Sequence, residues 1–294
     1  MVAGLCVAAL GALALPAAAA QKKVLVVTVT KGFRHSSIPT AEKVLAELGQ
    51  KSGIWTVDYA RVEPSDAQYK GDDGKPDQAK VDAAITAVLA EKMSAAALKN
   101  YDAVIFANTT GDLPLPDKQA FLDWIKSGKA FIGVHSAADT FDKTGKTEGW
   151  MPYVEMLGSQ FRTHGAQAEV DCQNQDPKHA ATKDLPATWH VKDEIYLMND
   201  YNPATVHELL TLDKHPNDGT AGHYPISWCK MYGKGRVFYT SLGHREDVWD
   251  PETPAKFKRE NSKEVAERYQ TFILGGIKWA MGLAGGDGKP QAKK

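Results

Sequence analysis

Three apolar runs without polar alternation constrain the fold of this chain most strongly. They are KKVLVVTVTKG (22–32), YDAVIFANTTG (101–111) and AFIGV (130–134). This pattern is typical of strands buried on both faces, as in parallel sheets covered by helices on both sides. Helical patterns alternate with these runs and with a further strand-like segment at 54–60; they cover residues 36–53, 81–98 and 116–129. The alternation predicts an α/β fold with a doubly wound, mostly parallel sheet.

The pattern changes after about residue 160. Five strand-like segments follow, and the turn YGKG joins the last two as a hairpin; the segments are 166–172, 194–200, 206–212, 224–232 and 235–243. An amphipathic helix at 262–282 precedes a tail rich in Gly, Lys and Pro. We therefore expect added antiparallel strands in the C-terminal half. We also expect a single domain over 21–284 and a disordered tail over 285–294.

The first 20 residues contain no charged side chain and end in a run of alanines. This composition is typical of a secretory signal peptide, so we expect residues 1–20 to be removed and the protein to be secreted to the periplasm. Cys172 and Cys229 are the cysteines beyond this leader. In an oxidising compartment they could form a disulfide, and otherwise they would be two buried thiols.

The overall charge of the chain excludes some classes of partner. The formal net charge is −1, and no stripe of Lys and Arg is present, which argues against nucleic acid. No segment beyond the leader is apolar enough to span a membrane. We expect a small-molecule ligand and no nucleotide cofactor, and the sequence leaves the oligomeric state open.

Histidines gather where the predicted strands end. In open parallel sheets, ligands bind beyond the carboxyl ends of the strands. Loops at these ends carry Arg34, His35, Asn108, His135, Asp139, His244, Arg245 and Glu246, and the separate loop FRTHG carries Arg162 and His164. We therefore predict one pocket that contains His35, His135 and His244. The other histidines lie in polar loops or strands, where solvated or structural roles are expected.

Such a group of imidazoles could bind a divalent metal. Neutral imidazole suits Zn, Co, Ni or Mn, and a carboxylate could complete the ligand set. The predicted metal ligands are His35, His135, His164, His244 and Glu194, which opens the segment EIYLMND. The alternative is a hydrogen-bonded cluster of histidines and acids without a metal.

The predicted substrate-binding residues are Arg34, Asn108, Asp139, Arg162, Arg245 and Trp228. Trp150 and Trp249 are further candidates for stacking on sugars, with core packing as the alternative.

The segment AFIGVHSA has the strand, glycine and sharp turn of a nucleophile elbow. It resembles the elbow of class I glutamine amidotransferases, which carry a cysteine there and a His-Pro-Glu triplet after a late strand. Here His135 occupies the cysteine position, and the later triplet reads His244-Arg245-Glu246. Glutamine hydrolysis is therefore not expected. Ser136 lies one position from the tip, which disfavours it as a substitute nucleophile.

Several longer motifs point to one family. They are VTKGFRHSSIPTA, GVHSA, GSQFRTHG, DEIY, YPISWCKMYGKGRVFYTSLGHRED and FILGGIKWAMG, and they lie in order over residues 24–282. Together they resemble the ThuA-like (trehalose utilisation) family, a branch of the class I glutamine amidotransferase-like superfamily. The resemblance implies a flavodoxin-like, amidotransferase-related α/β fold. It also implies a role in sugar metabolism, particularly of glycosides oxidised at the 3-position.

A 3-keto-glycoside suits the chemistry of these residues. The ketone acidifies the neighbouring C–H bond, so a histidine base could remove that proton and the glycosidic oxygen would leave by elimination. We expect a metal-dependent lyase or hydrolase with His35, His135 and His244 as catalytic residues and Glu246 holding His244. One alternative is a non-catalytic sugar-binding module with a degenerate amidotransferase site. A two-carboxylate glycosidase ranks last, because the strand ends show histidines rather than paired acids.

Overall fold

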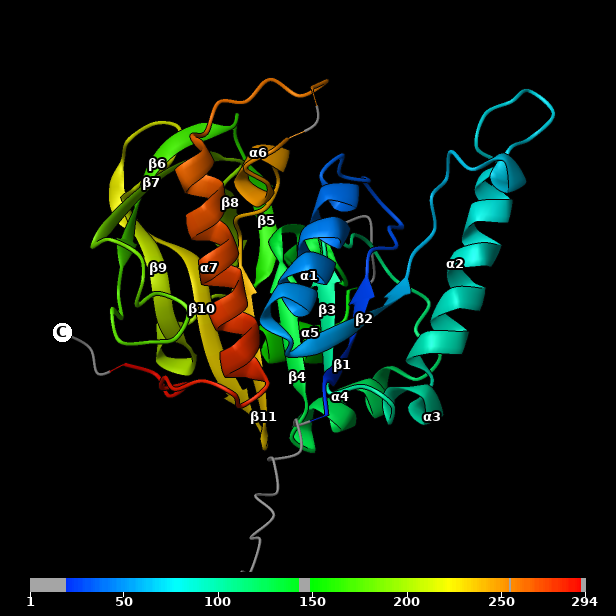
Figure 1. Ribbon diagram of the computed structural model, residues 1–294, viewed down its shortest axis with the longest axis horizontal. Helices are drawn as coiled ribbons and strands as arrows, with labels where there is room; N and C mark the ends of the chain where they lie inside the picture. Colours follow the sequence, from blue (N-terminus) through cyan, green and yellow to red (C-terminus); the bar gives the residue numbers. More distant parts are fainter. Residues whose placement is uncertain (1–19, 143–148, 254, 292–294) are drawn as a thin grey trace, which may run out of the picture.

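A single nine-stranded sheet forms the centre of the computed structural model, which describes residues 20–142, 149–253 and 255–291. The strand order is β2-β1-β3-β4-β11-β10-β9-β6-β7 (Figure 1). The first five strands in this order are parallel; they are β2 (Trp55–Ala60), β1 (Lys22–Val27), β3 (Ala103–Ala107), β4 (Ala130–Val134) and β11 (Gly235–Thr240). The predicted doubly wound sheet is confirmed.

The second half of the chain extends this sheet with antiparallel strands. They are β10 (Ala221–Tyr232), β9 (His207–Lys214), β6 (Ala168–Asn174) and β7 (Thr188–Asp193). Strands β5 (Gln160–His164) and β8 (Tyr196–Asn199) pair separately as a two-stranded sheet. Strand β11 is thus the junction, because it pairs in parallel with β4 and forms the predicted hairpin with β10.

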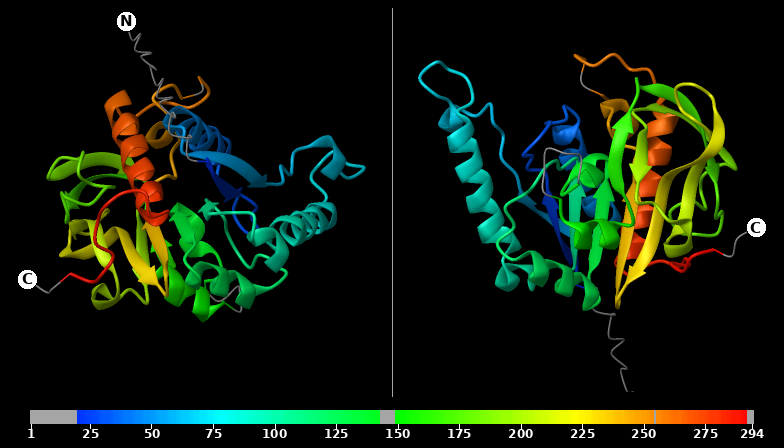
Figure 2. Two further views of the ribbon diagram at one scale, coloured as in Figure 1. Left: turned by 60° about the horizontal axis from the view of Figure 1, so that its bottom comes forward. Right: turned by 180° about the vertical axis from the view of Figure 1, so that it is seen from behind.

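Helices cover both faces of the parallel region. Helices α1 (Ile38–Ser52) and α7 (Lys263–Ala280) pack on the face that is turned forward in Figure 1, and the short α6 (Glu246–Trp249) lies beside them. The opposite face, seen from behind in Figure 2, is covered by α2 (Gln78–Met93), α3 (Ala95–Leu98), α4 (Lys118–Lys126) and α5 (Met151–Leu157). The described residues also form three short 3-10 helices: η1 (Ala67–Tyr69), η2 (His135–Asp139) and η3 (Pro203–Thr205).

This two-sided cover explains why the strand runs lack polar alternation. In β1, Val24 and Val26 contact one hydrophobic cluster, and Leu25 and Val27 contact the other. All four side chains are fully buried. Successive side chains of a strand point to opposite faces, so both faces need apolar residues when helices cover both.

Some predicted boundaries differ from the structure. The predicted helix 81–98 is two helices, because the Ser94 side chain accepts a hydrogen bond from Ala97 N and begins α3. Strand β7 is not predicted, although its exposed and buried residues alternate over TWHVKD as in a half-buried strand at an edge of the sheet. Strand β5 and helix α5 were missed as well. Elements this short carry little periodicity.

The C-terminal segment is packed against the sheet rather than disordered as predicted. Lys289 O accepts a hydrogen bond from His207 Nδ1 at 2.8 Å, and Gln291 Oε1 accepts one from Glu208 N at 3.0 Å. These contacts tie Lys289 and Gln291 to β9. The last three residues of the predicted tail lie outside the described residues, and so does the expected signal peptide apart from residue 20.

The two cysteines beyond the leader do not pair. Cys172 and Cys229 are both free and buried. Cys229 Sγ instead lies 3.5 Å from Asp287 O, within the packed C-terminal segment. Of the two possibilities left open by the sequence, the structure therefore has the buried thiols.

Within the part of the chain that is described, no helix combines the length and apolar character that a membrane crossing requires.

The start of β11 leaves no room for a side chain at Gly235. A Cβ there would lie 2.0 Å from Ile125 O and 2.6 Å from Lys129 O, and neither backbone atom can move away freely. We expect Gly235→Ala to lower the free energy of unfolding by about 2 kcal/mol, measured by urea denaturation. Gly285→Ala is the matched control, because nothing lies within 4 Å of its Cβ position. Equal destabilisation by both changes would contradict this account of the junction strand.

Candidate metal centre

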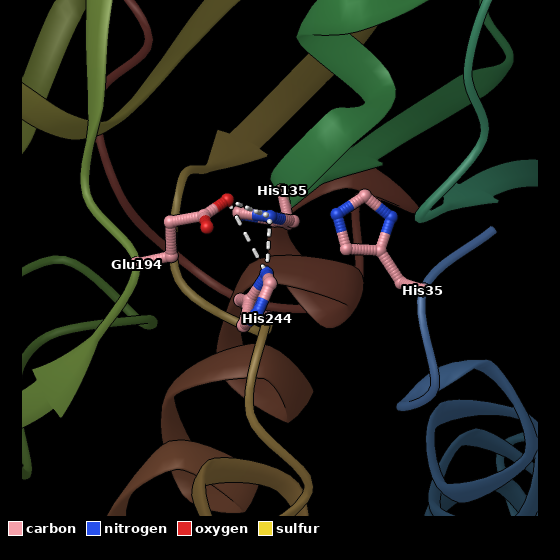
Figure 3. A group of neighbouring side chains, drawn as sticks. All are labelled: His35, His135, Glu194 and His244. Atoms are coloured by element: carbon pink, nitrogen blue, oxygen red, sulfur yellow. Dashed lines mark hydrogen bonds and ion pairs between the residues drawn. The ribbon is translucent and has the colours of Figure 1, made fainter. Parts of the chain in front are cut away.

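Four side chains from distant parts of the chain meet at the carboxyl edge of the parallel strands. His35 follows β1, His135 follows β4, His244 follows β11, and Glu194 lies between β7 and β8. One possible ligand atom from each lies within 4.8 Å of those of the other three. Figure 3 shows contacts that link His135, His244 and Glu194, with His35 set apart from them. The structure thus brings together the three histidines that the sequence placed in one pocket.

His135 is held at the tip of the predicted elbow in a conformation that is uncommon for a residue other than glycine. Its φ is 48°, and η2 begins at this residue. Such a left-handed conformation costs about 1 kcal/mol or more, so surrounding contacts must maintain it. The hydroxyl of Tyr239 donates to His135 O at 2.8 Å and supplies one of these contacts. The elbow therefore projects an imidazole instead of a thiol.

A backbone carbonyl determines which ring nitrogen of His135 faces the cluster. His135 Nδ1 lies 2.7 Å from Ser241 O, a carbonyl that can only accept, so Nδ1 carries the proton. His135 Nε2 then presents its lone pair to the cluster. It lies 3.3 Å from His244 Nδ1 and 3.6 Å from Glu194 Oε1. This arrangement of the second ring nitrogen is usual for metal-binding histidines.

The buried carboxylate of Asp193 positions two of the loops that form the cluster. It accepts hydrogen bonds from the backbone N–H groups of Glu194 at 3.0 Å, Gly243 at 2.7 Å and Arg245 at 3.1 Å. Gly243 and Arg245 flank His244. One fully buried side chain therefore fixes both Glu194 and His244. Asp193 is not among the predicted site residues, and its place directly before Glu194 is the signal that could have identified it.

The pKa values of His35 and His244 shift in opposite directions. Burial, followed by the charges that His135 and His244 would carry, lowers the pKa of His35 to about 2. Burial also acts to lower the pKa of His244, but the hydrogen bond to Glu194 and the charge of Asp193 outweigh it and raise that pKa. Burial would raise the pKa of Glu194, yet the neighbouring imidazoles of His135 and His244 hold it well below its usual range. Burial thus favours the neutral form of His35, whereas His244 and Glu194 favour each other's charged forms.

The donor set fits a divalent metal. His135 Nε2, His244 Nδ1 and Glu194 Oε1 are 3.3 to 3.6 Å apart, so electron pairs face one another unless a proton or a cation lies among them. Atoms bound at about 2.0 to 2.1 Å to one tetrahedral ion are about 3.3 Å apart, which is close to the observed separations. Nitrogen and carboxylate donors suit Zn and its neighbours in the first transition row. The three close donor atoms, with the imidazole of His35 nearby, thus suit a divalent ion of this group.

His164 lies just outside this group of four, although it was predicted as a ligand. Its Nδ1 is 3.2 Å from Glu194 Oε2 and 2.9 Å from Gly165 O. The two carboxylate oxygens of Glu194 thus face different partners, with Oε1 toward His244 and Oε2 toward His164. The side chain of His164 is 43% exposed, which places it at the solvent side of the cluster.

Glu246 does not hold His244 as predicted. Its Oε1 accepts a hydrogen bond from Ser36 Oγ at 2.6 Å, at the beginning of α6. The acid that contacts His244 is Glu194, at 3.3 Å. The prediction rested on nearness in sequence, but the antiparallel half of the fold brings a different carboxylate to the imidazole.

The predicted arginine clamps Arg34 and Arg245 are engaged within the protein. Arg34 donates to Thr28 O at 3.2 Å and to Glu63 Oε2 at 2.9 Å. Arg245 forms a two-point contact with Asp247 at 2.9 and 3.0 Å. Both guanidinium groups therefore join loops near the site, and their roles as substrate clamps stay predictions. Arg162 is exposed on β5.

Asn108 also joins loops. Its side chain is fully buried and donates from Nδ2 to Ser37 Oγ at 2.8 Å and to Gly243 O at 3.2 Å. It therefore connects the loop after β1 to the loop after β11, which corrects its predicted role as a substrate contact. Asp139 is half-buried at the end of η2.

The tryptophans predicted to stack on sugars pack within the protein. Trp228 is fully buried, with its ring against Tyr201 and Tyr239 and its Nε1 donating to Leu157 O at 2.8 Å. Its predicted role is therefore wrong. Trp249 is fully buried as well, and half-buried Trp150 contacts Phe141.

Comparison with known proteins decides the family. A family model described as ThuA, trehalose utilisation, matches residues 23–280. The chain belongs to the ThuA family. This family description relates the chain to carbohydrate metabolism, in agreement with the resemblance in its motifs.

Solved structures of ThuA-like proteins share this fold. One from Bacteroides uniformis has 20% sequence identity and a TM-score of 0.60, and the match covers 91% of this chain and 95% of that chain. Another from Parabacteroides merdae has 20% identity and a TM-score of 0.61, with 89% and 90% covered. The comparison with curated proteins finds no match. At this identity the structures support the fold of the ThuA chain and not a particular reaction.

The lowered pKa of His35 predicts a pH dependence of stability for the metal-free protein. The unfolded chain binds a proton at His35 near pH 6.5, whereas the folded chain does so only near pH 2. Stability therefore decreases as the pH falls below 6.5, by up to about 1.4 kcal/mol per pH unit from this group. Between pH 6.5 and 4.5, the free energy of unfolding of His35→Gln should decrease less than that of the wild type when both are measured by urea denaturation in chelator. Equal slopes for the two proteins would contradict a neutral, buried His35.

Proposed function

We propose that this ThuA protein is a metal-dependent lyase or hydrolase that cleaves 3-keto-glycosides. The observation that carries the proposal is the convergence of His135 Nε2, His244 Nδ1 and Glu194 Oε1 within 3.3 to 3.6 Å of one another. The family description, trehalose utilisation, supports a sugar as the substrate. An elbow that carries an imidazole in place of a thiol argues against acyl transfer through a covalent intermediate.

In this proposal His135, His244 and Glu194 hold the ion, and neutral His35 lies within reach as a further ligand. A divalent metal at this position would supply Lewis acidity toward the ketone oxygen. The protein contributes by fixing the ligands before the substrate arrives. Ser241 O sets the tautomer of His135, and Asp193 fixes the backbone on both sides of His244.

We assign the proton transfers to His164. Its Nδ1 faces Glu194 Oε2 and Gly165 O, which are both acceptors, so Nδ1 carries a proton and Nε2 is left with its lone pair. Nε2 would take the proton from C2 of the sugar, next to the 3-ketone. The C2 electron pair then forms the C1=C2 bond as the C1–O bond breaks. The imidazolium returns the proton to the departing oxygen, which yields an enone and the free alcohol.

Hydrolysis would differ from this elimination by the later addition of water to the enone.

We also propose that the protein is exported, as the uncharged, alanine-rich leader over residues 1–20 suggests. Mass spectrometry of the mature protein from its host would test this part separately. A chain that retains its first residues in the cytoplasm would contradict it.

Metal removal gives the direct test of the proposed reaction. We expect the purified protein to release glucose from 3-keto-trehalose, and we expect chelator to abolish release because the ketone loses its Lewis acid. Added Zn, Co, Ni or Mn should restore it, and metal analysis should find about one ion per chain. Turnover that is unaffected by chelator would contradict a metal centre. Binding of the sugar without turnover would favour the alternative of a non-catalytic sugar-binding module.

A pair of matched variants tests which carboxylate belongs to the centre. Glu194→Gln removes the charge next to His244 and His164, so we expect about a hundredfold loss of metal affinity or of kcat/KM. Glu246→Gln changes the acid that accepts from Ser36, so its effect should stay within about threefold. Calorimetric metal titration and turnover measure the two effects. Equal losses in both variants would contradict the assignment to Glu194.

A further inference from the structure

Phe33 is the most exposed large hydrophobic residue in the described part of the chain, at 67%. Single exposed apolar side chains are common on protein surfaces, so exposure alone indicates no function. Two further observations distinguish this one, namely how its backbone is anchored and what its ring contacts.

The backbone around Phe33 is fixed on both sides. On one side, Gly32 N donates to Thr110 Oγ1 at 3.1 Å, and that hydroxyl donates to Phe33 O at 3.0 Å. On the other side, Arg34 is bound to Thr28 O at 3.2 Å and to Glu63 at 2.9 Å. The ring is therefore presented to solvent by an anchored loop, and its exposure is part of the fold.

The ring of Phe33 stands next to the candidate metal centre. It contacts the ring of His35 with centroids 4.9 Å apart and an interplanar angle of 81°. The His35 ring is in turn 4.9 Å from that of His135 and 5.2 Å from that of His244. His35 is only 4% exposed and Phe33 is 67% exposed, so Phe33 is the ring of this contacting pair that is open to a ligand.

We propose that Phe33 is a stacking platform that binds the apolar face of a pyranose ring at the entrance of the site. This inference rests on the proposed function, which supplies the sugar. The axial C–H groups of a pyranose form an apolar face that suits contact with an aromatic ring, while its hydroxyl groups remain solvated. Stacking at Phe33 would orient a glycoside beside His35 and the centre behind it.

The surroundings of Phe33 fit a single sugar ring better than a protein partner. Its nearest chain neighbours with large side chains are the charged Lys31 and Arg34. The other exposed large hydrophobics of the described chain belong to different elements, namely Met151 in α5, Met231 in β10 and Leu283 after α7. A stable protein interface needs about 800 Å² from each partner, far more than one isolated phenyl ring provides.

Substitutions at Phe33 test the inference with 3-keto-trehalose as the probe. We expect Phe33→Ala and Phe33→Leu to raise KM about tenfold, because neither side chain offers an aromatic face. We expect kcat to stay within about twofold, since Phe33 does not touch the reacting atoms. Phe33→Trp should keep or lower KM. Met231→Ala is the matched control, because it removes an exposed hydrophobic on β10 and should leave KM unchanged.

The possible outcomes separate this inference from the proposed function. If the wild type turns over the probe and Phe33→Ala has an unchanged KM, the platform is disproved while the proposed function holds. A change in oligomeric state of Phe33→Ala with unchanged KM would instead identify the ring as a protein contact and also overturn the inference. If the wild type neither binds nor cleaves the probe, the proposed function fails, and the platform fails with it.

Discussion

Parallel pairing of β1, β3, β4 and β11 is the constraint on which the rest of this structure depends. Strands that run in the same direction end at the same edge of a sheet, so the loops that follow them are neighbours however far apart they lie in the chain. His35, His135 and His244 are brought together in this way. Any shift in the pairing of β11 with β4 would separate two of these imidazoles, which is why close packing at the start of β11 bears on the site at its other end.

Buried polar contacts then refine what the sheet has brought together. The Asp193 carboxylate binds three backbone N–H groups, and Ser241 O sets the ring orientation of His135. Asn108 connects two of the loops. Each of these polar groups is costly to bury without partners, so together they favour one arrangement of the cluster over its alternatives. The strained backbone of His135 is maintained within the same network.

The amidotransferase-related fold is used here with different side chains. An elbow that presents a thiol in class I glutamine amidotransferases presents the imidazole of His135 in this ThuA protein. Glu194, which comes from the antiparallel half of the chain, completes a set of donors that a nucleophile-based site would not need. The same scaffold can therefore support chemistry of another class, because the fold fixes positions and the side chains at those positions decide the reaction.

The sequence by itself determined the parallel core and the gathering of three histidines, because apolar runs report burial on both faces and strand ends share one edge. It also identified the family through motifs ordered along the chain. Only the tertiary structure decided that Glu194 rather than Glu246 contacts His244, that Trp228 is buried, and that Phe33 is exposed. Those outcomes depend on how the antiparallel half and the loops fold back over the sheet, and long-range packing of that kind leaves no periodic signal in the residues it joins.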